Sequence, residues 1–233
     1  MRKRKRLGQH FLISQTVAKK IVEAARITKK DVVLEIGTGR GILVPLLCEK
    51  AKQVISIEAD YTLYKNAKES FSDIDNLELV HGDGFKSSQK FSIFVSNLPY
   101  SNSRKAMEWL IQKKFSHAVV MIQKEFYEKL TATGKNRKAV SILVNYSTEI
   151  EKISNVSKNN FTPPPKIDSV VLKFTRKKTL SIELIQTVNR MFSYKRKNIQ
   201  NILKQFGKKI ASDKRLEELS SEEIINIAKK ILK

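Results

Sequence analysis

Short runs of apolar and β-branched residues recur along the first three quarters of the chain and predict the strands of a sheet. The runs cover residues 32–36, 53–57, 77–80, 92–96, 118–122 and 170–174. Between them lie stretches with helical spacing, such as 43–50 and 103–113, where Leu110 and Ile111 follow Met107 by three and four positions. Strands that alternate with helices are typical of a doubly wound parallel sheet. The predicted fold class is therefore α/β.

Near residue 177 the pattern changes from alternating strands and helices to helices alone. Apolar residues follow helical spacing over 184–192, and the acidic residues after Ser220 are typical of the first turn of another helix. We therefore expect two domains, an α/β domain over residues 1–176 and a small helical domain over residues 177–233.

The charge of the chain indicates a polyanionic partner. The sequence has 45 Lys and Arg residues against 23 Asp and Glu residues, a formal net charge of +22. Self-repulsion on this scale disfavours a compact state unless a partner neutralises it. No apolar stretch approaches the roughly 18 residues that span a bilayer, so nucleic acid is a better candidate than a membrane.

The N-terminus and the single cysteine bear on the cell compartment. The basic segment Arg2-Lys3-Arg4-Lys5-Arg6 leads into no apolar stretch, so we do not interpret it as a secretory signal. It is either a nuclear address or a phosphate-binding arm. Cys48 is the only cysteine, which excludes an intramolecular disulfide and a cysteine-based metal cluster. We expect an intracellular, cytoplasmic protein.

A glycine-rich turn after the first predicted strand carries the clearest signal for a ligand site. Gly37, Gly39 and Gly41 occupy alternate positions after Glu35. Such glycines let the backbone turn sharply into a helix and approach a ligand closely. No Gly-Lys-Ser/Thr follows, which excludes a P-loop, and the spacing differs from the G-x-G-x-x-G of dinucleotide sites. The spacing therefore favours a ligand with an amino-acid end over a pyrophosphate.

Two carboxylates follow the next two predicted strands. Glu58 lies about 20 residues past the glycines, where an acidic side chain can accept both ribose hydroxyls. Asp83 follows the third strand and can accept a hydrogen bond from an adenine amino group. Each residue also has an ordinary interpretation, Glu58 as a solvated strand end and Asp83 as a turn residue. Their joint place at the carboxyl ends of successive strands favours a nucleoside-binding site.

The tetrapeptide Asn97-Leu98-Pro99-Tyr100 closes the fourth predicted strand, and with it the chain resembles a known family. The sequence is similar to the ribosomal RNA adenine N6-dimethyltransferases (the KsgA family) in seven blocks that occur in the family's order. The blocks are Gly8-Gln9-His10-Phe11-Leu12, residues 35–41, Glu58, Asp83, residues 97–100, residues 123–125 and residues 161–169. The short chain and its Arg- and Lys-rich start look more like an archaeal-type member. The resemblance implies a Rossmann-like, S-adenosylmethionine-dependent methyltransferase sheet with a small helical C-terminal domain.

The resemblance also implies the ligands of the site. The methyl donor would be S-adenosylmethionine, the product S-adenosylhomocysteine, and no metal is expected. The residues that would bind the donor are His10, Leu12, Gly37, Gly39, Gly41, Glu58, Asp83 and Asn97. Phe161 would help to wall the target-base pocket, or alternatively belongs to the hydrophobic core.

The chemistry of methyl transfer explains the tetrapeptide. An exocyclic adenine amine is a poor nucleophile because its lone pair is delocalised into the ring. The Asn97 side-chain oxygen and the Leu98 carbonyl can accept its two hydrogens, while Pro99 stiffens the turn that carries them. Tyr100 offers an aromatic face for a base that has left its stack. The ordinary alternative is a turn with a capping Asn and a packed Tyr.

A second basic segment lies in the C-terminal part. Lys195, Arg196 and Lys197 follow two aromatic residues and resemble the family's C-terminal basic helix, which is expected to contact rRNA phosphates. The alternative is a solvated helix face beside core aromatics. Together with Arg2–Arg6, this triad is the expected RNA-binding surface.

These observations lead to one expected function and two alternatives. We expect a monomeric enzyme that dimethylates the N6 amines of two adjacent adenosines near the 3′ end of small-subunit rRNA, either naked or in a pre-ribosomal small subunit. The first alternative is an Erm-type methyltransferase of large-subunit rRNA. The second is a non-catalytic nucleic-acid-binding factor on the same fold.

Overall fold

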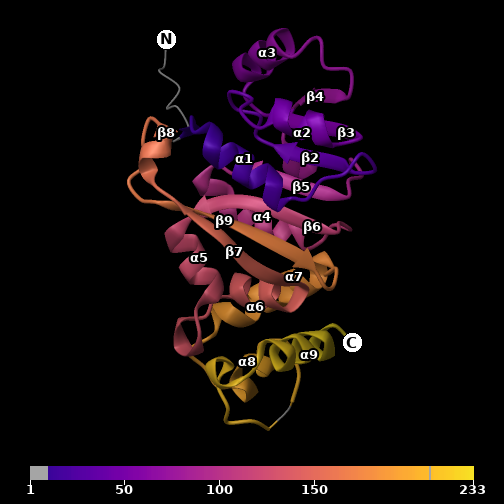
Figure 1. Cartoon of the computed structure of the whole chain (residues 1–233). Helices are drawn as coiled ribbons and strands as arrows, with labels where there is room; N and C mark the ends of the chain where they lie inside the picture. The colour runs from indigo at the N-terminus through magenta and orange to yellow at the C-terminus, as the bar shows by residue number, and fades with distance from the viewer. Residues whose placement is uncertain (1–9, 210) are drawn as a thin grey trace, which may run out of the picture. The chain divides into compact units, whose positions relative to one another are not determined.

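The computed structural model describes residues 10–209 and 211–233, and a seven-stranded sheet forms its centre (Figure 1). Strand order across the sheet is β4-β3-β2-β5-β6-β9-β7. The strands are β2 (Val32–Ile36), β3 (Gln53–Glu58), β4 (Leu77–His81), β5 (Ile93–Asn97), β6 (His117–Gln123), β7 (Thr148–Val156) and β9 (Ser169–Arg176). The ladders from β4 to β6 are parallel, and β9 pairs antiparallel to β6. The α/β fold predicted from the sequence is confirmed.

The six strands predicted from apolar runs all form, within one or two residues of the expected bounds. Strand β7 was missed because its sequence mixes charged and apolar residues, and many of its side chains are exposed or half-buried. Strands β1 (Phe11–Leu12) and β8 (Phe161–Thr162) were missed because two residues are too short for a periodic signal.

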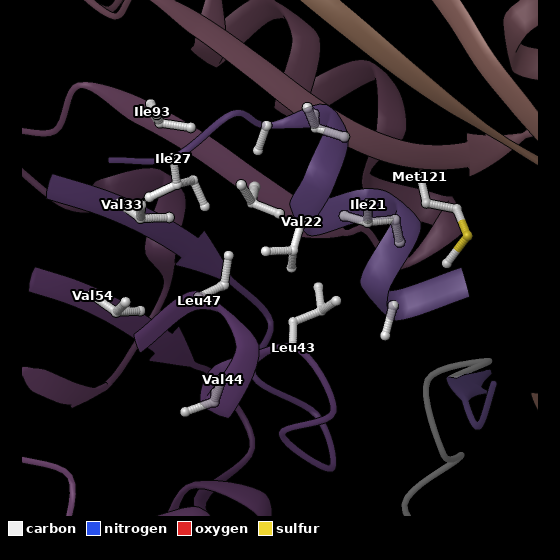
Figure 2. Close-up of a cluster of buried hydrophobic side chains, with 14 of the residues drawn as sticks. Ile21, Val22, Ile27, Val33, Leu43, Val44, Leu47, Val54, Ile93 and Met121 are labelled. Atoms are coloured by element: carbon white, nitrogen blue, oxygen red, sulfur yellow. The ribbon is translucent and has the colours of Figure 1, made fainter. Parts of the chain in front are cut away.

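Helices α1 (Gln15–Ala24), α2 (Val44–Lys50) and α3 (Tyr61–Ser70) belong to the same compact unit as the parallel strands. Side-chain caps begin two of them, because Ser14 accepts a hydrogen bond from Val17 and Asp60 accepts from Thr62 and Leu63. Figure 2 shows side chains from α1, α2 and the strands pointing toward one another in one apolar cluster. Its labelled members are Ile21, Val22, Ile27, Val33, Leu43, Val44, Leu47, Val54, Ile93 and Met121.

A two-stranded antiparallel sheet joins segments that lie 150 residues apart. Phe11 of β1 is opposite Thr162 of β8, and Leu12 is opposite Phe161. The backbone N–H of Ile13 extends the contact by donating to the carbonyl of Asn160 at 2.9 Å. The pairing brings the first and the last of the seven family-like blocks side by side.

The chain divides into two compact units. The first comprises the described residues up to Ala106 together with Lys114–Lys124 and Ile150–Thr175. The second comprises Met107–Lys113, Glu125–Glu149 and Arg176–Lys233. The second unit thus includes two internal segments in addition to the C-terminal stretch, whereas the domain boundary at residues 176 and 177 stays a prediction.

Helices dominate the second unit, as the change of pattern predicts. They are α5 (Lys124–Thr131), which begins one residue before this unit, α6 (Ala139–Ser147), α7 (Ile182–Ser193), α8 (Ile199–Lys204) and α9 (Ser221–Leu232). A reciprocal capping box begins α9, since the Ser220 hydroxyl accepts from the Glu223 N–H and the Glu223 carboxylate accepts from the Ser220 N–H. Helix α4 (Ser103–Leu110) runs from the first unit into the second. Across the described residues, every helix is too short or too polar to cross a lipid bilayer.

Candidate active site

A cavity lies at the carboxyl ends of the parallel strands β2, β3 and β5. It contains about 650 Å³ of empty space, part of which is continuous with solvent. Open α/β sheets bind their ligands at this edge. The cavity is lined by His10, Phe11, Leu12, Glu35, Gly37, Thr38, Gly39, Arg40, Ile42, Leu43, Glu58, Asn97, Leu98, Pro99 and Tyr100.

The glycine-rich turn after β2 forms one wall of this cavity. Its three glycines have φ values of +89°, +58° and +75°, a left-handed conformation that residues with a Cβ rarely adopt. Gly37 and Gly39 line the cavity. Gly41 does not, and a Cβ there would lie 2.3 Å from the ring of Phe71. Two glycines therefore shape the ligand wall, and the third makes room for packing inside the protein.

Glu58 ends β3 with its carboxylate fixed by the backbone. The side chain is 5% exposed. One carboxylate oxygen accepts from the Gly39 N–H and the other from the Asp60 N–H, both at 2.9 Å. Each oxygen retains a second lone pair. Since Glu58 also lines the cavity, it presents two oriented acceptors to a ligand with neighbouring hydroxyl groups.

A buried chain of polar side chains lies behind the glycine turn. The Ser56 hydroxyl donates to the Glu35 carboxyl at 2.6 Å, and the Thr38 hydroxyl lies 2.6 Å from that of Ser56. Burial is the main cause that raises the pKa of Glu35, and the charge of Glu58 adds to it, whereas the hydrogen bond from Ser56 opposes it. The resulting pKa is about 8. The Glu35 carboxyl is therefore mostly protonated at neutral pH. Sequence reasoning used Glu35 only as a marker of the turn and missed Ser56 and Thr38 altogether.

The segment Asn97–Tyr100 forms the wall opposite the glycines. Asn97 is the last residue of β5, and its side-chain amide hydrogen-bonds to no residue in the described part of the chain. Leu98 is 2% exposed and lines the cavity. The Tyr100 hydroxyl lies 2.8 Å from that of Ser169. Burial raises the pKa of the Tyr100 phenol, which therefore stays neutral at physiological pH.

Strand β1 supplies the third wall. The His10 Nδ1 lies 2.7 Å from the carbonyl oxygen of Pro163, and because a carbonyl only accepts, Nδ1 carries the proton. Phe11 was expected only as part of the first family-like block, yet it lines the cavity. The Arg40 guanidinium lies over its ring, 4.9 Å from the centroid. Arg40 has no separate sequence signal beyond its place between two glycines.

Three expected site residues do not line the cavity. Gly41 packs against Phe71, as described above. Phe161 is 3% exposed and belongs to the apolar core, where it pairs with Leu12. Asp83 lies in the loop after β4 and forms an ion pair of 3.0 Å with Lys105. The expected roles of these residues in donor or base binding stay predictions.

A second, strongly basic cavity lies within the second unit. It contains about 930 Å³ of empty space, part of it open to solvent. Its lining residues are Gly134, Lys135, Asn136, Arg137, Phe192, Lys195, Arg196, Arg215, Leu216 and Glu217. The Arg137 guanidinium is fixed there by donating to the carbonyls of Leu216 and Leu219. Five cationic side chains face a single carboxylate, so the cavity suits an anionic ligand.

The triad Lys195–Lys197 does not lie on a helix, which corrects the sequence-based expectation. Helix α7 ends at Ser193, where Tyr194 caps it, and α8 begins at Ile199 with Asn198 as its side-chain cap. Lys195 and Arg196 line the basic cavity, whereas the Lys197 ammonium lies 5.3 Å from the centroid of the Tyr194 ring. The other expected RNA-binding residues, Arg2 to Arg6, lie outside the described residues.

Known proteins with similar sequences are ribosomal RNA methyltransferases, in agreement with the residues found in this cavity. A family model described as ribosomal RNA adenine dimethylase matches residues 1–233. A protein of Thermotoga maritima named ribosomal RNA small subunit methyltransferase A is 37% identical over 239 residues, covering 99% of this chain and 86% of the relative. A Pyrococcus abyssi protein, named as a probable member of the same group, is 36% identical over 86% of this chain and 75% of its own length.

Solved structures show the same fold. A dimethyladenosine transferase from Plasmodium falciparum superposes with a TM-score of 0.80 at 29% identity, covering 94% of this chain and 96% of that one. The 23S rRNA methyltransferase ErmE superposes with a TM-score of 0.71 at 23% identity, covering 96% of this chain and all of that one. Sequence match, fold and cavity agree, and the chain belongs to the ribosomal RNA adenine dimethylase family.

Proposed function

We propose that this protein transfers methyl groups from S-adenosylmethionine to the N6 amines of two adjacent adenosines near the 3′ end of small-subunit rRNA, giving N6,N6-dimethyladenosine during ribosome assembly. The observation that carries the proposal is the presence of Asn97 and Leu98 in the same cavity as Gly37, Gly39 and Glu58. The names of the Thermotoga and Pyrococcus relatives support the small-subunit substrate.

The residues of the cavity fit the methyl donor. Glu58 presents two fixed carboxylate oxygens, which suit the hydroxyls of a ribose. Gly37 and Gly39 line the cavity without side chains of their own, which leaves room for the amino-acid end of the donor. Leu12 and His10 border the cavity from β1 and its preceding residue. When bound, S-adenosylmethionine supplies the methyl group and leaves as S-adenosylhomocysteine.

Asn97 and Leu98 prepare the target amine. The Asn97 side-chain oxygen, which hydrogen-bonds to none of the described residues, and the Leu98 carbonyl would accept the two hydrogens of an exocyclic amine. The lone pair of the amine then returns from the ring to the nitrogen. Pro99, with φ of −55°, stiffens the turn that carries both acceptors. Because transfer discharges the positive charge of a sulfonium, the site needs neither a strong base nor a metal, and we expect none.

Tyr100 holds the target base in this scheme. Its ring lines the cavity and is fixed by the Ser169 contact and by the ring of His10. An adenine must leave its helical stack before its N6 can reach a buried site, and an aromatic face replaces part of the lost stacking. We also propose that Phe161 supports this pocket through its pairing with β1 rather than by direct contact with the base.

The basic cavity of the second unit is the proposed rRNA contact. Lys195 and Arg196 share it with Lys135, Arg137 and Arg215. Such residues position RNA through its phosphates and do not read its sequence. Because the proposed substrate is rRNA or a pre-ribosomal small subunit, we place the protein in the cytoplasm, and we propose that it acts as a monomer.

Mass spectrometry of nucleosides tests the proposal directly. The protein is incubated with S-adenosylmethionine and either small-subunit particles lacking the modification or naked large-subunit RNA. N6,N6-dimethyladenosine in the small-subunit sample alone supports the proposal, whereas modification of the large-subunit RNA alone supports the Erm-type alternative. Absence of product from both, combined with no heat of S-adenosylmethionine binding in calorimetry, supports the non-catalytic alternative.

A further inference from the structure

Lys105 joins the start of α4 to Asp83 in the loop after β4, and neither residue lines the cavity of the candidate site. It stands near the start of α4, five residues after Tyr100. Its ammonium lies 3.0 Å from Asp83 and 4.7 Å from the centroid of the Phe85 ring. Its side chain is 55% exposed. An ion pair this exposed contributes little to the free energy of folding. Its main effect is on the position and charge of the Asp83 carboxylate.

The Asp83 carboxylate is held on both sides. One oxygen accepts from the Phe85 N–H at 3.0 Å, and the other accepts from the Lys105 ammonium. Burial acts to raise the pKa of Asp83, but Lys105, the Phe85 N–H and the charge of Lys86 outweigh it and lower the pKa below its ordinary value. The carboxylate is therefore ionised and restrained, and each oxygen has a lone pair left over.

The loop that carries Asp83 is also fixed in place. A Cβ on Gly84 would lie 2.7 Å from the Ile36 side chain, so the loop packs directly on the residue before the glycine turn. On the other side, the Ser103 hydroxyl donates to the Tyr100 carbonyl at 3.0 Å and ties the start of α4 to the tetrapeptide. Lys105 thus links the start of α4, just after Tyr100, to the loop of Asp83, which is expected to recognise adenine.

We propose that Lys105 is a positioning residue for the methyl donor, which holds the Asp83 carboxylate in the orientation that accepts the adenine amino group. This inference rests on the proposed function, since it requires the donor site. A neutral amino group is a weak hydrogen-bond donor and gains most from an acceptor that is charged and already ordered. Without Lys105, the Asp83 side chain keeps its charge but loses one of the two contacts that order it.

The test compares two ligands that differ at the 6-position of the purine and in the protonation of the neighbouring N1. S-adenosylhomocysteine carries the adenine amino group, and S-inosylhomocysteine carries a carbonyl oxygen there. Calorimetry measures both affinities for the wild-type protein, for Lys105→Met and Lys105→Arg, and for Lys86→Met. The last variant is the matched control, because Lys86 lowers the pKa of Asp83 through its charge but makes no contact with that side chain in the described structure.

We expect Lys105→Met to weaken S-adenosylhomocysteine binding at least fivefold and to shrink the preference for adenine over inosine by a similar factor. Lys105→Arg should restore most of the preference, and Lys86→Met should leave it within twofold of the wild type. A preference that is unchanged in Lys105→Met overturns the inference while the donor site stands. A wild-type protein that binds neither ligand overturns the proposed function as well, and a wild type that binds both equally overturns the role of Asp83 and Lys105 alone.

Discussion

The imidazole ring of His10 stacks on the phenol ring of Tyr100, with the two centroids 5.5 Å apart and the planes 30° from parallel. The hydrogen bond from His10 Nδ1 to Pro163 fixes the imidazole, and the Ser169 contact fixes the phenol. The proposed stacking face for the target base is therefore set by residues from three distant segments.

Loss of the His10 ring should slow methyl transfer because Tyr100 loses the ring that stacks on it. We expect His10→Ala to lower the single-turnover rate with small-subunit particles roughly 10-fold, because a small displacement of a positioning group costs alignment. His10→Phe keeps a ring but loses the hydrogen bond to Pro163, so its rate should lie between those of the wild type and His10→Ala. The rate is measured at saturating donor. A wild-type rate in His10→Ala would mean that Tyr100 is positioned without this stack.

Asn97→Ala removes one of the two proposed acceptors. Since its side chain is free of other hydrogen bonds in the described structure, the change should leave folding intact while the transfer rate falls on the order of 100-fold. Donor affinity, measured by calorimetry, should change by less than about threefold, because Glu58 and the glycine turn remain. Asn97→Asp keeps an acceptor oxygen at the same place and should retain more activity than the Ala variant. Normal turnover by Asn97→Ala would refute the proposed chemistry.

The basic cavity should govern RNA affinity and its dependence on salt. Replacement of Lys195, Arg196 and Lys197 by Ala should weaken rRNA binding. It should make the plot of log affinity against log salt shallower by about 1.5 units, as expected for the phosphate contacts of the two residues that line the cavity, Lys195 and Arg196.

A charge-matched control separates this local effect from the loss of net charge. Lys19, Lys20 and Lys30 are exposed and line neither cavity, so their replacement by Ala should leave the salt slope near the wild-type value. Equal losses in both triple variants, read from fluorescence anisotropy of labelled rRNA, would argue for general attraction without a defined site. Affinity for S-adenosylmethionine should stay unchanged in both.

Glu35 makes the stability of the free protein depend on pH. Its pKa is raised from an ordinary value of 4.5 to about 8 in the folded state, so the folded state binds a proton more tightly than the unfolded chain does. The protonated Glu35 carboxyl therefore stabilises the folded state fully below pH 4.5, and this stabilisation is lost as the pH rises toward 8. A shift of this size corresponds to on the order of 5 kcal/mol over the whole window.

The Glu35→Gln variant isolates this dependence. Gln keeps an acceptor for the Ser56 hydroxyl and cannot ionise. Urea unfolding without donor should show the free energy of unfolding of the wild type falling more steeply between pH 5 and pH 8.5 than that of Glu35→Gln. Parallel curves for the two proteins would show that the Glu35 carboxyl titrates near its ordinary range in the fold.

The strands and the ligand edge of the sheet could be predicted from the sequence because both leave local signals. Buried strands such as β2 and β6 are runs of apolar residues, and the ends of β3 and β5 carry Glu58 and Asn97, which line the cavity. These features depend on neighbours in the sequence and on the general geometry of parallel sheets.

Long-range contacts could not be predicted. The Glu35–Ser56 hydrogen bond, the Asp83–Lys105 ion pair and the pairing of β1 with β8 join residues that are 21, 22 and about 150 positions apart. The secondary structure around Lys195 was also mistaken, since the caps at Tyr194 and Asn198 interrupt what reads as one continuous basic helix. Spacing of residue types indicates which residues matter but not which of them meet.

The β1–β8 ladder has a consequence for how the enzyme is made. One wall of the cavity comes from Phe11 and Leu12, but their partner strand lies about 150 positions later in the chain and ends at Thr162. A polypeptide that ends before this point holds the glycine turn and the tetrapeptide but lacks the strand that pairs with Phe11 and the Pro163 carbonyl that binds His10. The wall of the cavity that β1 supplies is therefore completed only once residues 161–163 have been synthesised.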